Sequence, residues 1–141
     1  MSGMNSIIYI SQQARPLTEL DLRDILTTSR RNNAANHLSG MLLFCNGCLM
    51  QYLEGEELVL NQTYEKISRD KRHRDLVVLS RQPVTEREFA NWEMAYSDIS
   101  QPQFDELTSA SWLFDASTGL FRGQRLLRSF WQNNTPRTLG D

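Results

Sequence analysis

The stretch LSGMLLFCNGCLMQYLEG, residues 38–55, decides the fold of this chain. Two apolar runs flank Asn46 and Gly47, a dipeptide that accepts the positive φ values of a two-residue type I′ turn. The stretch therefore predicts a tight antiparallel hairpin with a fixed register. Apolar residues occupy both faces of each strand, as is typical of strands covered on both sides. We expect this hairpin at the centre of a sheet.

Gln51 is the polar exception in the second strand of the hairpin. Its amide carries two donors and two acceptor lone pairs, and a buried polar group without partners costs about 1–3 kcal/mol. A bonding partner for Gln51 must therefore lie inside the fold. Upstream, the alternation at residues 7–11 predicts a first strand that contains Tyr9. A strand tyrosine most often packs with its hydroxyl at the surface, so this pattern alone does not pair Tyr9 with Gln51.

The rest of the chain up to residue 98 alternates helical and strand patterns, starting with a capping box at Thr18 and Asp21. The order βαββαβ with an added fifth strand predicts an α+β, ferredoxin-like fold with both helices on one face of a mixed sheet. The further elements expected are a helix over residues 18–31, a second helix after Gly55 with Leu60, Tyr64 and Ile67 on one face, a fourth strand at residues 76–80, and a final strand through Trp92, Met94 and Tyr96.

The opposite sheet face would expose a large apolar patch unless something covered it. Two amphipathic segments follow residue 98 and are separated at Gly119, so they predict a C-terminal helical hairpin on that face. We therefore expect a domain over residues 5–98, a helical cap over 99–133 and a flexible tail over 134–141. The apolar residues of the two segments are Phe104, Leu107, Trp112 and Leu113, and then Leu120, Leu126, Leu127, Phe130 and Trp131.

Composition and charge exclude some classes of function. The chain has 141 residues, 40% of them hydrophobic, and a net charge of −2, which favours one core and argues against non-specific nucleic-acid binding. It has no apolar run of about 18 residues and its N-terminus lacks the features of a signal peptide. We expect a cytoplasmic protein with no membrane contact.

Cys45 and Cys48 form a C-x-x-C pattern beside the hairpin turn. A redox motif of this kind sits at a helix N-terminus, and a zinc site needs a second pair of ligands; the sequence shows neither context. The interpretation favoured by this pattern is two small residues next to a tight turn, with no metal site.

The sequence pattern allows two interpretations for each of two polar clusters. Asn32 and Asn33 fit a helix C-cap, yet side-chain amides at a helix end could also bind an imide-like ligand edge. The basic run at residues 69–74 fits compensation of a helix dipole, which is the commoner explanation, but cations there could also hold a phosphate.

Several short motifs together resemble the BLUF family of blue-light sensors using FAD, in order and at the expected spacing over about residues 5–98. The helical tail resembles that of short, single-domain members. The motifs are Tyr9-Ile10-Ser11, Arg31-Asn32-Asn33, Leu38-Ser39-Gly40, Gln51-Tyr52-Leu53-Glu54-Gly55, Arg69-Asp70-Lys71-Arg72-His73 and Asn91-Trp92-Glu93-Met94.

The resemblance implies a photoreceptor, not an enzyme, that binds FAD or FMN non-covalently and signals to a downstream protein. The resemblance does not decide whether the protein forms a homo-oligomer. Tyr9 would donate an electron and a proton, and Gln51 would bridge Tyr9 and the flavin edge. The remaining implied roles are ring-edge binding by Asn33 with help from Asn32, contacts to the C2=O side or ribityl chain by Arg72 and His73, clamping of the ring plane by Ile25 and Ile67, and signal relay by Trp92 and Met94.

Two rival classes fit the sequence less well. An RNA-binding module of this fold needs exposed aromatic residues on its central strands and a basic surface, whereas this chain is acidic. A small acyl-phosphate hydrolase needs a glycine-rich anion cradle, and residues 11–18, SQQARPLT, contain no glycine.

Overall fold

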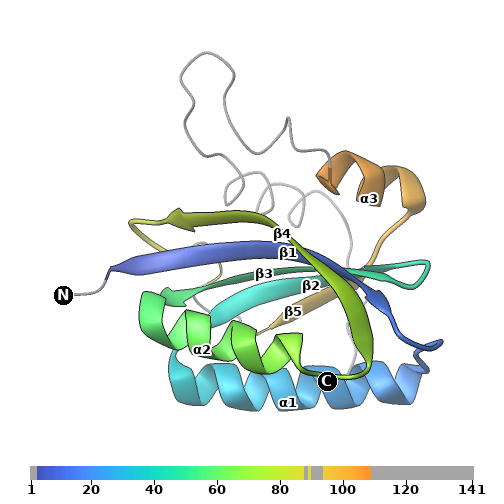
Figure 1. Ribbon diagram of the computed structural model, residues 1–141, viewed down its shortest axis with the longest axis horizontal. Helices are drawn as coiled ribbons and strands as arrows, with labels where there is room; N and C mark the ends of the chain where they lie inside the picture. The colour runs from blue at the N-terminus through green and yellow to red at the C-terminus, as the bar shows by residue number, and fades with distance from the viewer. Residues whose placement is uncertain (1–2, 88, 90–93, 109–141) are drawn as a thin grey trace.

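A five-stranded mixed sheet organises the computed structural model, which describes residues 3–87, 89 and 94–108 (Figure 1). The strand order is β4-β1-β3-β2-β5, in which β2 and β5 are parallel and the other neighbours antiparallel. This is the predicted ferredoxin-like order with an added strand. The strands are β1 (Met4–Gln13), β2 (Ser39–Cys45), β3 (Cys48–Glu56), β4 (His73–Pro83) and β5 (Ala95–Asp98).

The predicted hairpin is confirmed and lies at the centre of the sheet. Asn46 and Gly47 have φ values of 48° and 84°, as a type I′ turn requires. Strand β3 pairs with β2 on one side and with β1 on the other. The turn is also tied to β1, because the backbone N–H of Gln13 donates to the carbonyl of Gly47 at 2.8 Å.

Helix α1 (Glu19–Asn36) begins as predicted and ends later. Thr18 and Asp21 form the reciprocal capping box, with N–O distances of 3.0 and 2.9 Å. The end expected near residue 31 is wrong, and so is the C-cap interpretation of Asn32 and Asn33, because the helix runs on until His37 adopts a left-handed φ of 56°. Asn33 is buried, so tertiary packing carries the helix through the two asparagines, and the strong helix formers Ala34 and Ala35 continue it.

Helix α2 (Glu57–Ser68) lies beside α1 on one face of the sheet, as Figure 1 shows. The Glu56 carboxylate caps it by accepting from the backbone N–H groups of Leu58 and Val59. No helix in the described ranges is long and apolar enough to cross a membrane. Between helices and sheet lies the helix-side cluster: Ile7, Leu22, Leu26, Leu38, Leu42, Leu49, Leu53, Leu60, Met94 and Tyr96.

The bounds of three strands differ from the prediction: β1 runs beyond residues 7–11 at both ends, and β4 and β5 also differ. Strand β4 extends beyond the β-branched run of residues 76–80 in both directions, because it pairs with β1 from Gln13 opposite His73 to Asn5 opposite Pro83. The expected final strand is confirmed at Tyr96, but β5 begins at Ala95, so the placement of Met94 in that strand is wrong. Trp92, the first residue of the expected alternation, lies outside the described residues.

Helix α3 (Gln101–Thr108) covers the other face of the sheet (Figure 1), and its Phe104 is buried there as predicted. The second expected helix, around residues 120–131, and the tail from residue 134 lie outside the described residues. The buried residues on this face form the outer cluster: Ile8, Met41, Leu43, Cys45, Met50, Tyr52, Phe89 and Phe104.

A fully buried carboxylate joins the hairpin to the segment that follows β4. Glu54 accepts hydrogen bonds from the Ser39 hydroxyl at 2.8 Å, the Tyr52 hydroxyl at 2.8 Å and the backbone N–H of Phe89 at 2.7 Å. Arg87 adds a bond to the backbone carbonyl of Glu54 at 3.3 Å. These bonds hold β3, the strand that contains Gln51, against the segment after β4. That segment leads on to Met94.

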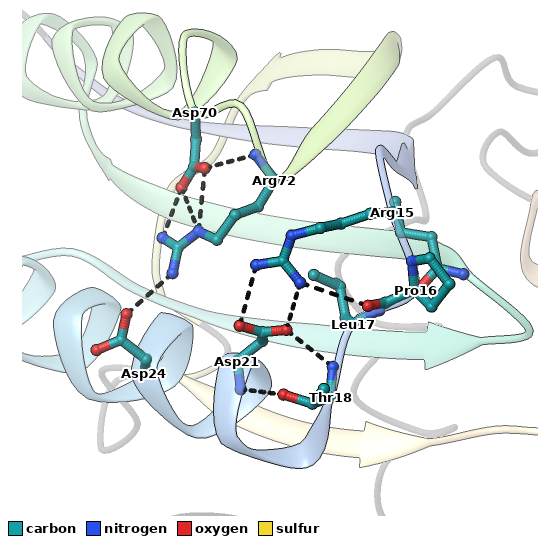
Figure 2. Close-up of polar contacts among 9 residues, drawn as sticks. Arg15, Pro16, Leu17, Thr18, Asp21, Asp24, Asp70 and Arg72 are labelled. Carbon is teal, nitrogen blue, oxygen red and sulfur yellow. Dashed lines mark hydrogen bonds and ion pairs between the residues drawn. The ribbon is translucent and has the colours of Figure 1, made fainter.

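Ion pairs close the end of the molecule at which β4 begins (Figure 2). The Arg72 guanidinium binds Asp70 at 2.6 Å and Asp24 of α1 at 3.0 Å, and so joins the turn after α2 to α1. Beside it, Arg15 binds Asp21 of the capping box at 2.9 Å. The Arg72 guanidinium holds the pKa of the Asp70 carboxyl below its ordinary value.

Replacement of Glu54 should destabilise the fold strongly. Glu54→Ala leaves three buried donors without their acceptor, so we expect a loss on the order of 3 kcal/mol in the free energy of unfolding. Denaturant unfolding measures this loss. Ser39→Ala removes only one donor of the set and should cost about 1 kcal/mol. Equal stability of Glu54→Ala and the wild type would show that the carboxylate is not the anchor.

The Asp70–Arg72 pair predicts an acid-sensitive contribution to stability. Because the folded pKa of Asp70 lies below its unfolded value, this contribution is present above the unfolded pKa of about 4 and disappears as pH falls through the folded pKa. Solvent screening limits it to about 1 kcal/mol or less. The midpoint temperature of thermal unfolding should therefore fall more steeply between pH 6 and pH 2 for the wild type than for Asp70→Asn. Asp75→Asn, which removes an exposed carboxylate 3.8 Å from Arg74, should follow the wild type; parallel curves for all three proteins would contradict the prediction.

Candidate functional site

A cavity of about 170 Å³ lies where α1, the end of α2 and the helix-side face of the sheet meet. Aliphatic and polar side chains both line it, and the polar ones come from the strands, from α1, from α2 and from the segment after α2. Among the residues expected to bind a ligand, Tyr9, Ile25, Asn32, Gln51, Ile67, Arg72 and His73 line it; the other lining residues are Ser11, Leu17, Thr28, Ser29, Leu42, Leu49, Lys66 and Asp70.

The floor of the cavity is a buried hydrogen bond between β1 and β3. Tyr9 and Gln51 are directly opposite in the strand register, and the Tyr9 hydroxyl donates to Gln51 Oε1. At the other end of the amide, Nε2 donates to the thioether sulfur of Met94 at 3.7 Å. All three side chains are at most 5% exposed. Both ends of the Gln51 amide therefore have a partner from the chain, which also fixes the orientation of the amide.

The environment of Tyr9 keeps its phenol neutral. Burial raises the pKa of Tyr9 above its ordinary value, and the nearby Tyr64 and Asp70 raise it further. The Tyr64 ring packs edge-on against the Tyr9 ring, with centroids 5.3 Å apart. A neutral phenol bound to an amide oxygen can release its proton only toward that oxygen or toward a group in the cavity.

The two helices supply the walls. Ile25 comes from α1 and Ile67 from α2, so an aliphatic side chain faces the cavity from each helix. Asn32 lines the cavity from α1. Its neighbour Asn33 is buried in the same helix and is not among the lining residues, so the structure does not bring this predicted ligand to the cavity surface.

His73, the first residue of β4, spans from the sheet to α2. Its Nε2 lies 2.7 Å from the carbonyl oxygen of Ile67, and its Nδ1 lies 2.9 Å from the Ser11 hydroxyl. Because a carbonyl oxygen only accepts, Nε2 carries a proton. His73 thus holds the end of α2 against β1, while Arg72 lies at the same end of the cavity in its pairs with Asp70 and Asp24.

Sequence reasoning missed eight lining residues, although periodicity could have found several. Thr28 and Ser29 follow Ile25 at the helical spacings of three and four residues, and Ser11 follows Tyr9 at the strand spacing of two. No pattern indicated Arg30, whose Nε donates to the backbone carbonyl of Met94 at 3.0 Å. That contact joins residues far apart in the sequence and depends on the tertiary fold.

Comparison with known proteins gives the family. The family model described as "Sensors of blue-light using FAD" matches residues 4–95. Photoactivated adenylate cyclase subunit beta of Euglena longa is 39% identical over 94 residues, which are 66% of this chain and 11% of that protein. The alpha subunit of Euglena gracilis is 36% identical over 86 residues, 61% of this chain and 8% of that protein. The chain therefore spans only about a tenth of these relatives.

Comparison with solved structures gives the same family. The photo-activated state of BlsA superposes with a TM-score of 0.76 at 25% identity, covering 96% of this chain and 99% of that one. BlrP1 of Klebsiella pneumoniae, with FMN and cyclic diGMP, gives 0.66 at 28% identity, covering 90% of this chain and 34% of that one. The ferredoxin-like fold and the family resemblance predicted from the sequence are both confirmed, and the chain belongs to the BLUF family of sensors of blue light using FAD.

Proposed function

We propose that this blue-light sensor binds the ring system of FAD in the cavity between α1 and α2 and signals by exchanging the hydrogen bonds of Gln51. The observation that carries the proposal is the buried bond between Tyr9 and Gln51 on the cavity floor. Residues 5–98 would form the flavin-binding domain. FMN shares the ring system with FAD and would meet the same residues.

The lining residues fit a flavin. An isoalloxazine ring is flat and apolar on its faces, and its edge carries carbonyl and imide groups. Ile25 and Ile67 would pack on the ring faces, while the amides of Asn32 and Gln51 supply donors and acceptors for the edge. Asn33 is proposed as a second edge ligand on the basis of the family motif. At the end where β4 begins, Arg72 and His73 would face the C2=O side or the ribityl chain.

Tyr9 would act as the donor. When bound, the flavin supplies blue-light absorption and accepts an electron. A neutral phenol has to lose a proton together with an electron, because its radical cation is a strong acid. Its pKa, raised by burial, ensures that Tyr9 starts neutral, and its bond to Gln51 holds that proton at a defined position.

Gln51 would act as the switch. The amide carries a donor at one end and an acceptor at the other, so turning it over or changing its tautomer exchanges which partner receives a hydrogen. A single hydrogen bond is worth about 0.5–1.5 kcal/mol net, so the light state can be small in structure and can revert thermally.

The signal would leave through Met94. Its sulfur accepts from Gln51 and its backbone carbonyl accepts from Arg30, so it links the switch to α1 and to the start of β5. Strand β5 leads on to α3. Trp92, outside the described residues, is proposed as a second relay residue. We expect a coupling on the order of 1–3 kcal/mol between the site and a downstream signalling protein or effector domain.

Illumination of the purified protein tests the proposal. The wild type should be yellow, and blue light should shift its flavin absorption to the red reversibly. Tyr9→Phe should keep the flavin and lose the shift, since the ring packing survives without the oxidisable hydroxyl. Tyr64→Phe is the matched control and should keep the shift, because Tyr64 packs on Tyr9 without bonding to Gln51. A colourless protein that FAD cannot reconstitute would refute flavin binding, and a normal shift in Tyr9→Phe would refute the donor role.

A second pair of variants separates the switch from the relay. Gln51→Leu should bind flavin but show no shift, because it has no amide to exchange partners. Met94→Leu keeps the amide and should keep the shift, but it removes the sulfur that accepts from Gln51. We therefore expect hydrogen exchange in β5 and α3 to rise on illumination in the wild type and to stay constant in Met94→Leu. A light-dependent change of equal size in Met94→Leu would place the relay elsewhere.

A further inference from the structure

The proposed function leaves the two cysteines beside the hairpin turn unused. Cys45 ends β2 and Cys48 begins β3, and they are directly opposite in the antiparallel register. Opposite residues of two antiparallel strands project to the same face of the sheet. The packing agrees, since Cys45 belongs to the outer cluster and Cys48 packs against it. The two thiols are therefore neighbours on one face.

The register brings the two Cα atoms within the range that a disulfide needs. Directly opposite residues in antiparallel strands have Cα atoms about 4.5–5.5 Å apart, within the range of about 4.4–6.8 Å found in disulfides. Asn46 and Gly47 provide the turn through their positive φ values, and the Gln13 N–H holds Gly47 in place. The Cβ atoms of such a pair lie about 4.5–5.5 Å apart, against about 3.5–4.5 Å in a disulfide, so closing the bridge requires side-chain rotation and a small local approach of the two strand ends, but no change of register.

The two thiols differ in their access to solvent. Cys45 is only 3% exposed, and burial raises the pKa of its thiol. Cys48 is half-buried and so meets a soluble oxidant first. Neither belongs to a group of three or more His, Cys, Asp or Glu side chains that could hold a metal, as far as the described residues show. The more accessible Cys48 is therefore the thiol that an oxidant reaches first, and the buried Cys45 opposite it is placed to resolve the product.

We propose that Cys45 and Cys48 form a reversible disulfide across the hairpin turn when the protein meets a peroxide. The Cys48 thiolate attacks one oxygen of the peroxide, the O–O bond breaks, and Cys48 becomes a sulfenic acid while the other oxygen leaves as hydroxide or alkoxide. Cys45 then loses its proton and attacks the Cys48 sulfur; the S–S bond forms, the S–O bond breaks and water leaves. The two thiols lose two electrons in total, and the peroxide gains them. A dithiol reductant reverses the change by thiol–disulfide exchange.

The bridge alters the contact between the hairpin and α3. The Cys45 thiol donates to Gln101 Oε1 at 3.7 Å, and the Asn46 amide donates to the same oxygen at 3.0 Å. Gln101 is the first residue of α3, at the same end of the sheet as the turn (Figure 1). A disulfide has no S–H to donate, so oxidation removes one of these two bonds. The cysteine pair therefore adjusts how firmly α3 is held, by chemistry that needs neither light nor flavin.

Mass spectrometry of the full chain tests the bridge. The protein is treated with about one equivalent of hydrogen peroxide in the dark, denatured and alkylated. The wild type should lose two hydrogens and both alkylatable thiols, with the linkage located between Cys45 and Cys48 by fragmentation, and dithiothreitol should restore both thiols. Cys45→Ser and Cys48→Ser should each fail to form the internal linkage. Sulfinic acid at Cys48 with an alkylatable Cys45, or only dimers joined through Cys48, would overturn the proposal.

Hydrogen exchange tests the effect on α3. Exchange in α3 should rise when the wild type is oxidised. Cys45→Ser keeps a hydroxyl that can donate to Gln101, so it should retain the protection of the reduced wild type and should not respond to peroxide. Cys45→Ala removes the donor and should match the oxidised wild type without any treatment. Unchanged exchange in α3 of a fully bridged wild type would overturn the link to α3.

Discussion

The hydrogen bond between Tyr9 and Gln51 depends on the register of β1 against β3, and much of the fold serves to hold that register. Successive side chains of a strand point to opposite faces, so a slip of one residue would turn either side chain away from the cavity. Several features prevent the slip. The type I′ turn sets β3 against β2, the Gln13 bond to Gly47 sets the end of β1 against the turn, and the Ser11–His73 contact ties β1 to β4.

Strand β3 serves both faces of the sheet. Gln51 points to the helices and the cavity, whereas Glu54, three residues later, points to the outer cluster and holds the segment after β4. The switch and the anchor are thus on one short, doubly covered strand. Because packed interiors are not continuously deformable, a change of partners at Gln51 is passed to Met94, which precedes β5, packs in the helix-side cluster and bonds to both Gln51 and Arg30.

The features that could be predicted from sequence are those with a local physical cause. Asn46 and Gly47 demand a particular turn, Thr18 and Asp21 satisfy the free donors of a helix start, and alternating apolar residues place strands. The end of α1 was predicted too early, since burial of Asn33 offsets its weak helix propensity and the strong helix formers Ala34 and Ala35 follow it. The cost of a buried amide without partners predicts that Gln51 has partners. Which residues they are depends on tertiary pairing and was indicated only by the family motif. The Arg30–Met94 contact has no local signature at all.

The present partners of Gln51 also favour one state of the amide over the other. As observed, Oε1 accepts from a hydroxyl and Nε2 donates to sulfur, so each end meets a group of suitable kind. After a turn of the amide, Oε1 would face the Met94 thioether, which has no hydrogen to donate, and a buried acceptor without a partner costs about 1–3 kcal/mol. Since about 1.4 kcal/mol changes an equilibrium tenfold, this cost makes the turned state roughly fivefold to more than a hundredfold rarer unless the cavity or a moving backbone provides a donor. A weak acceptor at position 94 is therefore sufficient to make the observed orientation of the Gln51 amide the resting state. The turned orientation is then a transient state.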